Sequence, residues 1–164
     1  RPLYVRPHMH PPTHTGPHGL AEFADECASA LLSEPQYNFS FPVGCSLQNW
    51  PIAEIKAANE DFLKSLRGRA NVYALFVRRS SAAQWLPVYV GERKSAGLRD
   101  RLTQHLITKH EQTGSMLEAV KTAVAAGEEI GISFIKVHPE SLRLFVEETI
   151  IAKHKEKLSW NIHG

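Results

Sequence analysis

Two short apolar segments separated by a polar turn most constrain the fold of this chain. Residues 72–77 and 86–90 are rich in Val, Tyr, Phe and Leu, and residues 78–84 between them are polar or small. β-Branched and aromatic residues favour strands, and a short polar connection lets consecutive strands pair antiparallel. The sequence therefore predicts a β-hairpin. If its strands pair symmetrically, Tyr73 lies directly opposite Tyr89.

The segments around this hairpin alternate between helical and strand patterns. Apolar residues recur at helical spacing in residues 97–109 and 115–126 and again after Pro139, whereas residues 130–137 are typical of a third strand. The order is β-β-α-α-β-α, which predicts a mixed α/β (α+β) fold. Residues 20–69 contain two more predicted helices, which we interpret as an N-terminal helical extension.

The first 19 residues differ in composition from the rest of the chain. Residues 1–19 contain five prolines and four histidines but few aliphatic side chains. The histidine spacing matches no compact zinc site, so a flexible Pro/His-rich arm is predicted. The chain starts at Arg1 rather than Met, which favours a processed product or a piece of a longer protein.

Composition indicates one core in a reducing compartment. The 164 residues are 43% hydrophobic, which is enough for one sizeable core. Cys27 and Cys45 lack metal-site spacing and are expected to be free thiols. No apolar run reaches the length of a membrane span, so we predict a soluble intracellular protein, cytoplasmic or nuclear, with no membrane partner. The net charge of +2 restricts any nucleic-acid contact to a local patch.

A basic segment follows the hairpin. Arg101 and His105 are spaced i, i+4 on a predicted helix, so both side chains leave the same face and can bind one anionic group. An ordinary solvated surface is the alternative. Arg93, Lys94 and Arg99 add positive charge nearby and are candidate DNA contacts.

Two carboxylates on the last predicted helix are candidate metal ligands. Glu147 and Glu148 lie between apolar residues, and a carboxylate beside an apolar stripe needs a compensating charge. Mg²⁺ prefers oxygen ligands of this kind. Alternatively, both carboxylates point to solvent and pair with Lys153 or Lys155.

Taken together, these positions resemble the GIY-YIG nuclease family. Residues 71–73 (Asn-Val-Tyr) and 89–91 (Tyr-Val-Gly) are similar to the two tripeptides that name the family. The resemblance covers residues 70–164, and it implies a catalytic domain built on a three-stranded antiparallel sheet flanked by helices. The family's remaining positions follow in order at Arg101, His105, Glu147 and Asn161.

The resemblance implies one divalent ion, Mg²⁺ or Mn²⁺, bound by Glu147, with Glu148 as the alternative ligand. In such enzymes the arginine steadies the scissile phosphate, a role that falls to Arg101 here. A tyrosine helps to activate the attacking water, which is the role implied for Tyr73.

Four further positions have supporting roles by the same resemblance. Tyr89 and His105 would orient the water or share its proton. Gly91 would let the backbone approach the phosphate closely, and Asn161 would support the site through hydrogen bonds.

The chain departs from the family's pattern at two informative positions. Asn71 replaces the glycine of the first tripeptide, and asparagine tolerates unusual backbone angles better than most residues. The acidic Glu92 follows Gly91, where a basic or small polar residue is frequent. A carboxylate there would repel DNA or add a metal ligand.

The sequence therefore predicts a metal-dependent DNA endonuclease of restriction, homing or repair type. A nucleic-acid-binding module that kept this scaffold without hydrolysis is the alternative. A purely structural interaction domain is the third interpretation.

Overall fold

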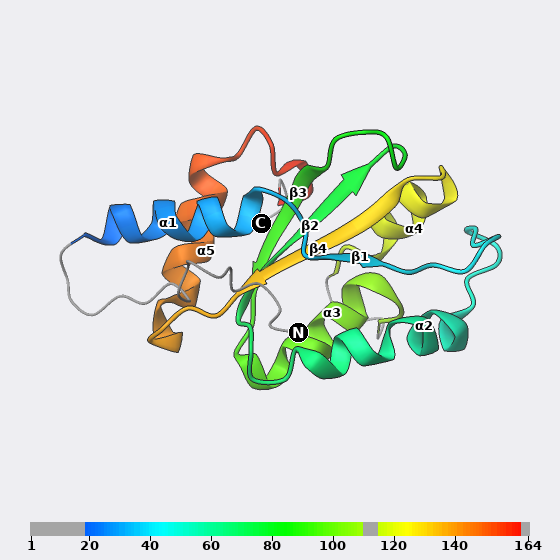
Figure 1. Cartoon of the computed structure of the whole chain (residues 1–164), viewed down its shortest axis with the longest axis horizontal. Coiled ribbons are helices and arrows are strands. Elements are labelled where there is room, and N and C mark those ends of the chain that lie inside the picture. The colour runs from blue at the N-terminus through cyan, green and yellow to red at the C-terminus, as the bar shows by residue number, and fades with distance from the viewer. Residues whose placement is uncertain (1–18, 110–114, 162–164) are drawn as a thin grey trace.

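Within residues 19–109 and 115–161, which the computed structural model describes, a four-stranded antiparallel sheet forms the centre of the protein (Figure 1). The sheet has the order β1-β4-β2-β3. The mixed α/β class, the hairpin and the later strand are confirmed, but the predicted number of three strands is one too low. The strands are β1 (Tyr37–Phe39), β2 (Val72–Arg78), β3 (Leu86–Glu92) and β4 (Glu129–Ile135).

The strand that the sequence analysis missed is β1, which pairs antiparallel with β4. Three residues are too few to show the alternation by which a strand is recognised. A buried amide fixes this segment instead. Asn59 accepts hydrogen bonds from the Tyr37 hydroxyl and the Ser40 backbone N–H, both at 2.8 Å. It also donates to the backbone carbonyls of Ser40 and Ile55, so β1 is held against the helix that carries Asn59.

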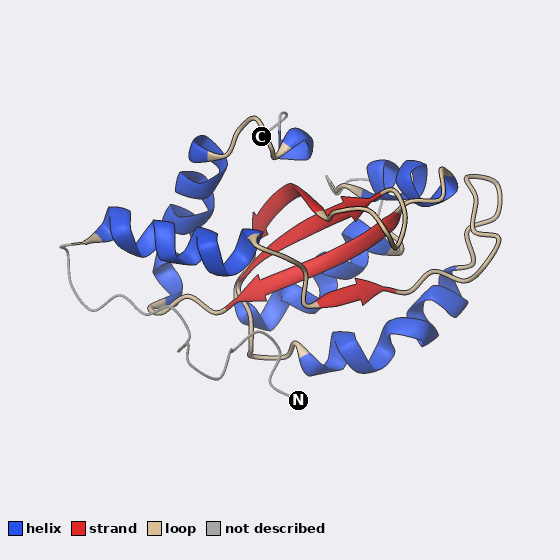
Figure 2. Cartoon of the chain, turned by 45° about the horizontal axis from the view of Figure 1, so that its top comes forward, coloured by secondary structure: helices blue, strands red, loops and turns tan. Residues whose placement is uncertain are grey.

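Helices cover both faces of the sheet (Figure 2). Among the described residues, no helix has the length and apolarity needed to cross a membrane. The arm predicted for residues 1–19 lies outside the described residues, except for Gly19. The helices are α1 (Leu20–Leu32), α2 (Ile52–Ser65), α3 (Leu98–Leu106), α4 (Leu117–Ala125) and α5 (Arg143–Lys153), with short 3-10 turns η1 (Ser95–Gly97), η2 (Glu140–Leu142) and η3 (Ser159–Asn161).

The alternation of side chains along the strands assigns the helices to the two faces. Ser133 of β4 faces α1, because its hydroxyl donates to the Leu31 carbonyl. Phe134, the next residue, faces the opposite side, where its ring centroid lies 6.0 Å from that of Phe62 on α2. Tyr73 pairs with Phe134 across the strands and contacts α3 on this same side. The fifth helix, α5, packs against β3 and α1.

The register of the hairpin differs from the predicted one. Tyr73 pairs with Gly91, and Tyr89 pairs with Leu75, so the two tyrosines are not directly opposite. The register shifts between Leu75 and Phe76, as in a β-bulge that inserts one extra residue into a strand. The tyrosines are therefore diagonal neighbours, and the position opposite Tyr73 is a residue without a side chain.

Asn59→Ala is expected to lower the free energy of unfolding by about 2–4 kcal/mol, because it leaves buried backbone groups near Ser40 without partners. Urea unfolding followed by circular dichroism measures this loss. Asn38→Ala is the matched control, since it removes only an exposed hydrogen bond to Glu129 and should cost less than about 1 kcal/mol. Equal losses in the two variants would contradict the structural role of Asn59.

Candidate active site

A buried tyrosine and histidine form the centre of the candidate site. The Tyr73 hydroxyl on β2 lies 2.6 Å from Nε2 of His105 on α3. Both side chains are enclosed, with 1% and 0% of their surfaces exposed. A polar pair buried this deeply is stable only if its hydrogen-bonding groups are satisfied, so the positions of the remaining donors and acceptors decide its chemistry.

The backbone of Met116 fixes the tautomer of His105. The Met116 N–H donates to Nδ1 of the ring at 3.0 Å, so Nδ1 carries no proton. Burial, and then the charges of Arg101 and Arg93, lower the pKa of His105 to about 3, and the ring is neutral at physiological pH. Its one ring proton is therefore on Nε2, which donates to the Tyr73 oxygen.

This arrangement changes the role expected for His105. With both ring nitrogens hydrogen-bonded, the imidazole has no free nitrogen for a water molecule. Because His105 donates to the Tyr73 oxygen, the hydroxyl hydrogen of Tyr73 is left to donate elsewhere. The same donation would stabilise a Tyr73 phenolate. The geometry thus joins His105 to the site through Tyr73 and not through direct contact with a water.

The second tyrosine completes an aromatic cluster around this pair. The ring centroid of Tyr89 lies 6.2 Å from that of Tyr73 and 5.2 Å from that of His105. Burial is the main cause that raises the pKa of Tyr89, and burial followed by the neighbouring phenol raises that of Tyr73 well above its usual value. Both phenols are therefore neutral near pH 7, and ionisation requires an added positive charge.

Arg101 supplies positive charge next to both phenols. By its charge and by hydrogen bonding, it lowers the pKa of Tyr73 and of Tyr89 against the effect of burial. Arg99, by contrast, points toward α2 and forms an ion pair with Glu60 at 3.2 Å. The expectation that Arg101 and not Arg99 accompanies His105 agrees with this geometry.

Glu147 brings negative charge to the same cluster from α5. It is half-buried and close enough to Tyr89 to raise the pKa of that phenol. Burial, and then the carboxylates of Glu92 and Glu148, raise the pKa of Glu147 to about 7. No described residue forms an ion pair with Glu147. Lys153, which the sequence offered as a partner, pairs with Asp25 instead. The negative charge of Glu147 therefore lacks compensation within the described structure.

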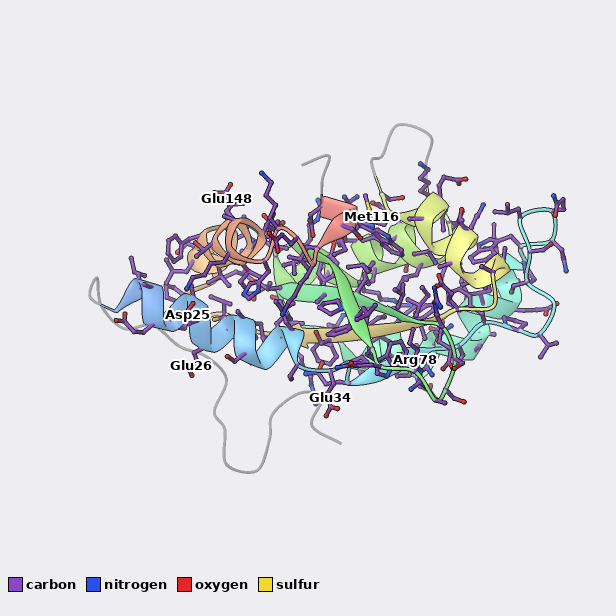
Figure 3. The ribbon with its side chains drawn as sticks, turned by 90° about the horizontal axis from the view of Figure 1, so that it is seen from above. Asp25, Glu26, Glu34, Arg78, Met116 and Glu148 are labelled. Carbon is purple, nitrogen blue, oxygen red and sulfur yellow. The ribbon has the colours of Figure 1, made fainter. Side chains whose placement is uncertain are left out.

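The neighbouring carboxylates differ from Glu147 in their surroundings. Glu148 is exposed and points away from the sheet on the outer side of α5 (Figure 3). Glu92 forms an ion pair with Arg143 at 2.8 Å, so its negative charge is already partly neutralised within the protein. Glu147 is thus the carboxylate that lies with the tyrosines.

The donor set suits a divalent cation of the hard, oxygen-preferring kind. The uncompensated carboxylate of Glu147 is the kind of ligand that Mg²⁺ takes, since this ion keeps several waters and needs only one or two carboxylates. Within the described residues there is no group of three or more His, Cys, Asp or Glu side chains suited to a metal. Glu147 would therefore act as the principal protein ligand.

Gly91 is required by the tyrosine ring that faces it. A Cβ at position 91 would lie 2.5 Å from Cζ of Tyr73 and 3.0 Å from Cε2 of Tyr89. Distances this short are not tolerated between carbon atoms. The resemblance assigns Gly91 to close approach of the phosphate, whereas the geometry shows that the residue makes room for Tyr73.

Asn71 has a structural role that a glycine could not fill. Its side-chain amide accepts from the Val137 N–H at 2.7 Å and donates to the Val137 carbonyl at 3.0 Å. Its own carbonyl accepts from the Arg93 N–H at 3.0 Å. Asn71 therefore ties the end of β4 to the segment that carries Arg93, whose charge reaches both Tyr73 and His105.

Asn161 supports the site from the other side of the hairpin. Its Oδ1 accepts from the Val90 N–H at 2.8 Å, and its Nδ2 donates to the Val90 carbonyl at 2.9 Å. The amide thus satisfies backbone groups of the edge strand next to Tyr89 and Gly91. It lies beside the candidate site as a support for β3.

Two residues of the site were missed by the sequence analysis. Met116 acts through its backbone N–H, which no side-chain pattern reveals. Glu140 accepts from the Ser95 N–H at 2.8 Å, a bond that lowers the pKa of its carboxyl and fixes η1 beside the site. The proline before Glu140 indicates only the start of a helix, so its contact with residue 95 carries no sequence signal.

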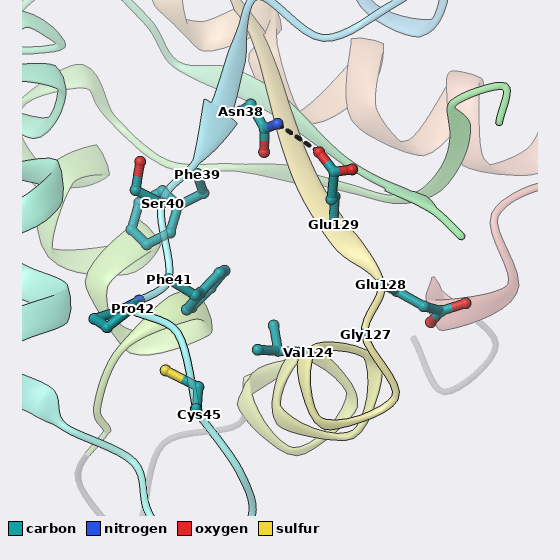
Figure 4. A pocket seen from close by; sticks show the side chains of 11 residues that line it. Asn38, Phe39, Ser40, Phe41, Pro42, Cys45, Val124, Gly127, Glu128 and Glu129 are labelled. Carbon is teal, nitrogen blue, oxygen red and sulfur yellow. Dashed lines mark hydrogen bonds between the residues drawn. The ribbon is translucent and has the colours of Figure 1, made fainter. Parts of the chain in front are cut away.

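A separate pocket lies at the N-terminal end of β4 (Figure 4). It has a volume of about 520 Å³ and is bordered by β1, the loop that follows it, and α4. Phe41, Cys45 and Val124 are among its lining residues. Cys27 and Cys45 are both free thiols, as predicted. None of the predicted site residues lines this pocket, so it is not part of the candidate site.

No protein-family model, curated protein or solved structure matches the chain. The resemblance to the GIY-YIG nucleases therefore rests on the sequence positions alone and stays a prediction.

Gly91→Ala is expected to lower the free energy of unfolding by about 1–3 kcal/mol, because the new methyl group must displace the Tyr73 ring. Gly97→Ala is the control, since its methyl group would meet only the flexible Arg93 side chain at 3.3 Å. Urea unfolding of the two variants compares the effects. A Gly91→Ala protein as stable as Gly97→Ala would refute the proposed contact.

His105 should make the stability of the protein fall as the pH is lowered. The folded ring stays neutral down to a pKa of about 3, whereas the unfolded side chain takes up a proton below about 6.5, so acid favours the unfolded chain. Between these values the free energy of unfolding should decrease by up to about 1.4 kcal/mol per pH unit from this group.

Urea unfolding at pH 7.5, 6.0 and 5.0 measures this contribution as the difference between wild type and His105→Gln. His154→Gln is the control, because His154 is only partly buried and so carries a smaller desolvation penalty than the enclosed His105. Stability curves of wild type and His105→Gln that run parallel over this range would exclude the buried neutral imidazole.

Proposed function

We propose that the protein is a metal-dependent endonuclease that hydrolyses phosphodiester bonds in DNA. The observation that carries this proposal is the convergence of Tyr73, Tyr89, Arg101 and Glu147, which come from β2, β3, α3 and α5. A cation, an uncompensated carboxylate and two phenols in one cluster match the needs of phosphodiester hydrolysis. We propose further that the protein acts inside the cell, in the cytoplasm or nucleus.

The residues divide the work of the reaction. Arg101 would bind the non-bridging oxygens of the scissile phosphate, since a guanidinium matches phosphate geometry with two parallel hydrogen bonds. Glu147 would hold one Mg²⁺ or Mn²⁺. When bound, such an ion neutralises phosphate charge, favours ionisation of nearby oxygen acids and stabilises the leaving 3′ oxygen.

Tyr73 would orient and deprotonate the attacking water. Its hydroxyl oxygen already accepts a hydrogen bond from the neutral ring of His105, and the same hydrogen bond would stabilise a phenolate at Tyr73. The positive charges of Arg101 and Arg93 favour the same ionisation. Water would then attack phosphorus as the bond to the 3′ oxygen breaks, and the proton would pass to the phenolate.

Glu147→Gln is expected to reduce DNA cleavage by about 100-fold or more, because the amide no longer holds the divalent ion. Conversion of supercoiled plasmid to the nicked form, with Mg²⁺ and with EDTA, measures this loss. Glu148→Gln is the matched control and should cleave at nearly the rate of the wild type, since Glu148 is exposed beside the site.

Three outcomes separate the interpretations. Mg²⁺-dependent nicking lost only in Glu147→Gln supports the proposed nuclease. Retention of the plasmid on the protein without nicking, in wild type as in both variants, would indicate the non-catalytic binding module. Neither retention nor nicking would indicate an interaction domain and end the proposal.

A further inference from the structure

The groove between α2 and α3 carries more positive than negative charge. It has a volume of about 620 Å³ and is open to solvent along α2 and η1. Its rim includes four cationic side chains against two acidic ones, Glu60 and Asp100. The other lining residues are uncharged and include the polar Ser95 and Thr103. The cations are Lys56, Lys64, Arg67 and Arg99.

Three of these cations line the α2 side of the groove. Lys56 and Lys64 lie about two turns apart on α2, and Arg67 lies just beyond the C-terminal end of this helix. The opposite face of α2 is buried through Ile55 and Phe62, which anchors the helix to the core. The fold therefore fixes the basic face of α2 toward solvent.

The acidic residue in the middle of this face is already paired. Glu60 lies 3.5 Å from Lys64 and 3.2 Å from Arg99, so these two cations already neutralise its negative charge. Lys56 and Arg67 are exposed and form no ion pair with any described residue. Lys56 and Arg67 are therefore the cations of the groove that remain free to bind a ligand.

A short segment links the groove to the candidate active site. The segment after β3 passes from Arg93, whose charge reaches Tyr73 and His105, through the exposed Lys94 to Ser95, which lines the groove. The hydrogen bond of the Ser95 N–H to Glu140 fixes this connection. The lining of the groove therefore begins two residues along the chain from Arg93.

The spacing suits a nucleic-acid backbone. The helical stretch from Lys56 to Ser65 rises about 14 Å, which corresponds to about four phosphates along one DNA strand, and Arg67 lies two residues beyond it. We infer that α2, with Arg99 of α3, binds the sugar-phosphate backbone of the DNA that flanks the cleavage site, without reading its sequence. This inference rests on the proposed function and assigns the N-terminal extension a part in substrate binding.

The test compares two charge-matched double variants of the full chain. Lys56→Gln/Arg67→Gln removes the unpaired cations of the groove, and Arg79→Gln/Lys155→Gln removes two exposed cations elsewhere. Binding of a fluorescein-labelled duplex of about 30 base pairs is measured by anisotropy in EDTA, at NaCl concentrations between about 50 and 200 mM. The logarithm of the affinity falls roughly linearly with the logarithm of the salt concentration, so this series gives a slope for each variant. Plasmid nicking with Mg²⁺ is measured in parallel.

The groove variant should bind the duplex on the order of 10-fold more weakly at 100 mM NaCl. The slope of log affinity against log salt should also fall by about 1.8, since each lost phosphate contact removes about 0.9. The Arg79→Gln/Lys155→Gln variant should keep the wild-type affinity and slope. Equal binding by the two variants would overturn the inference.

Further outcomes keep the inference separate from the proposed function. Wild-type cleavage together with wild-type binding by the groove variant removes only the role of α2. Neither binding nor cleavage by the wild type removes both proposals. Loss of binding to polyglutamate but not to DNA in the groove variant would assign the groove to an acidic polypeptide and also overturn the inference.

Discussion

The hydrogen-bonded series from the Met116 backbone through His105 to Tyr73 holds the site together. It joins the start of α4, the helix α3 and the central strand β2, and both of its side chains, Tyr73 and His105, are buried. Each link depends on the previous one, because the Met116 N–H sets the tautomer and the tautomer sets which atom donates to the phenol. An unsatisfied member would cost about 1–3 kcal/mol, so the series also fixes α3 in place. The position of Arg101 beside the phenols follows from it.

Opposite charges reach the aromatic cluster from opposite sides. Arg93 and Arg101 come from the segment after the hairpin and from α3, whereas Glu147 and Glu92 come from α5 and β3. The arginines favour ionisation of the phenols. The raised pKa of Glu147, about 7, shows that its negative charge is disfavoured for lack of a nearby cation, so a bound cation would stabilise it. Such separation suits a ligand that is itself an anion with a bound cation.

The sequence predicts the elements of this fold better than their contacts. The hairpin, the strand at 130–137 and the long helices have clear periodicity, and the structure contains them. Strand β1 escapes because three residues show no period, and the hairpin register escapes because a bulge has no signature in Leu75 or Phe76. Sequence patterns therefore predict the order of these elements, but not the contacts between their side chains.

The same limit applies to the site. Helical spacing correctly places Arg101 and His105 on one face of α3, and the apolar neighbours of Glu147 indicate its partial burial. The chemistry of His105 could not be predicted, because it depends on a backbone group 11 residues away. Likewise, Gly91 matches a motif, yet the reason for the missing side chain is visible only once Tyr73 lies across it.

The bond between Asn161 and Val90 has a consequence for how this protein behaves among copies of itself. β3 is an outer strand, and the free N–H and C=O groups of an outer strand are a template on which another chain can add a strand. The Asn161 amide imitates a peptide unit of such a neighbour and occupies both groups of Val90. Because Asn161 lies 71 positions further along the chain than Val90, this cover of the outer strand forms only when η3 docks against β3.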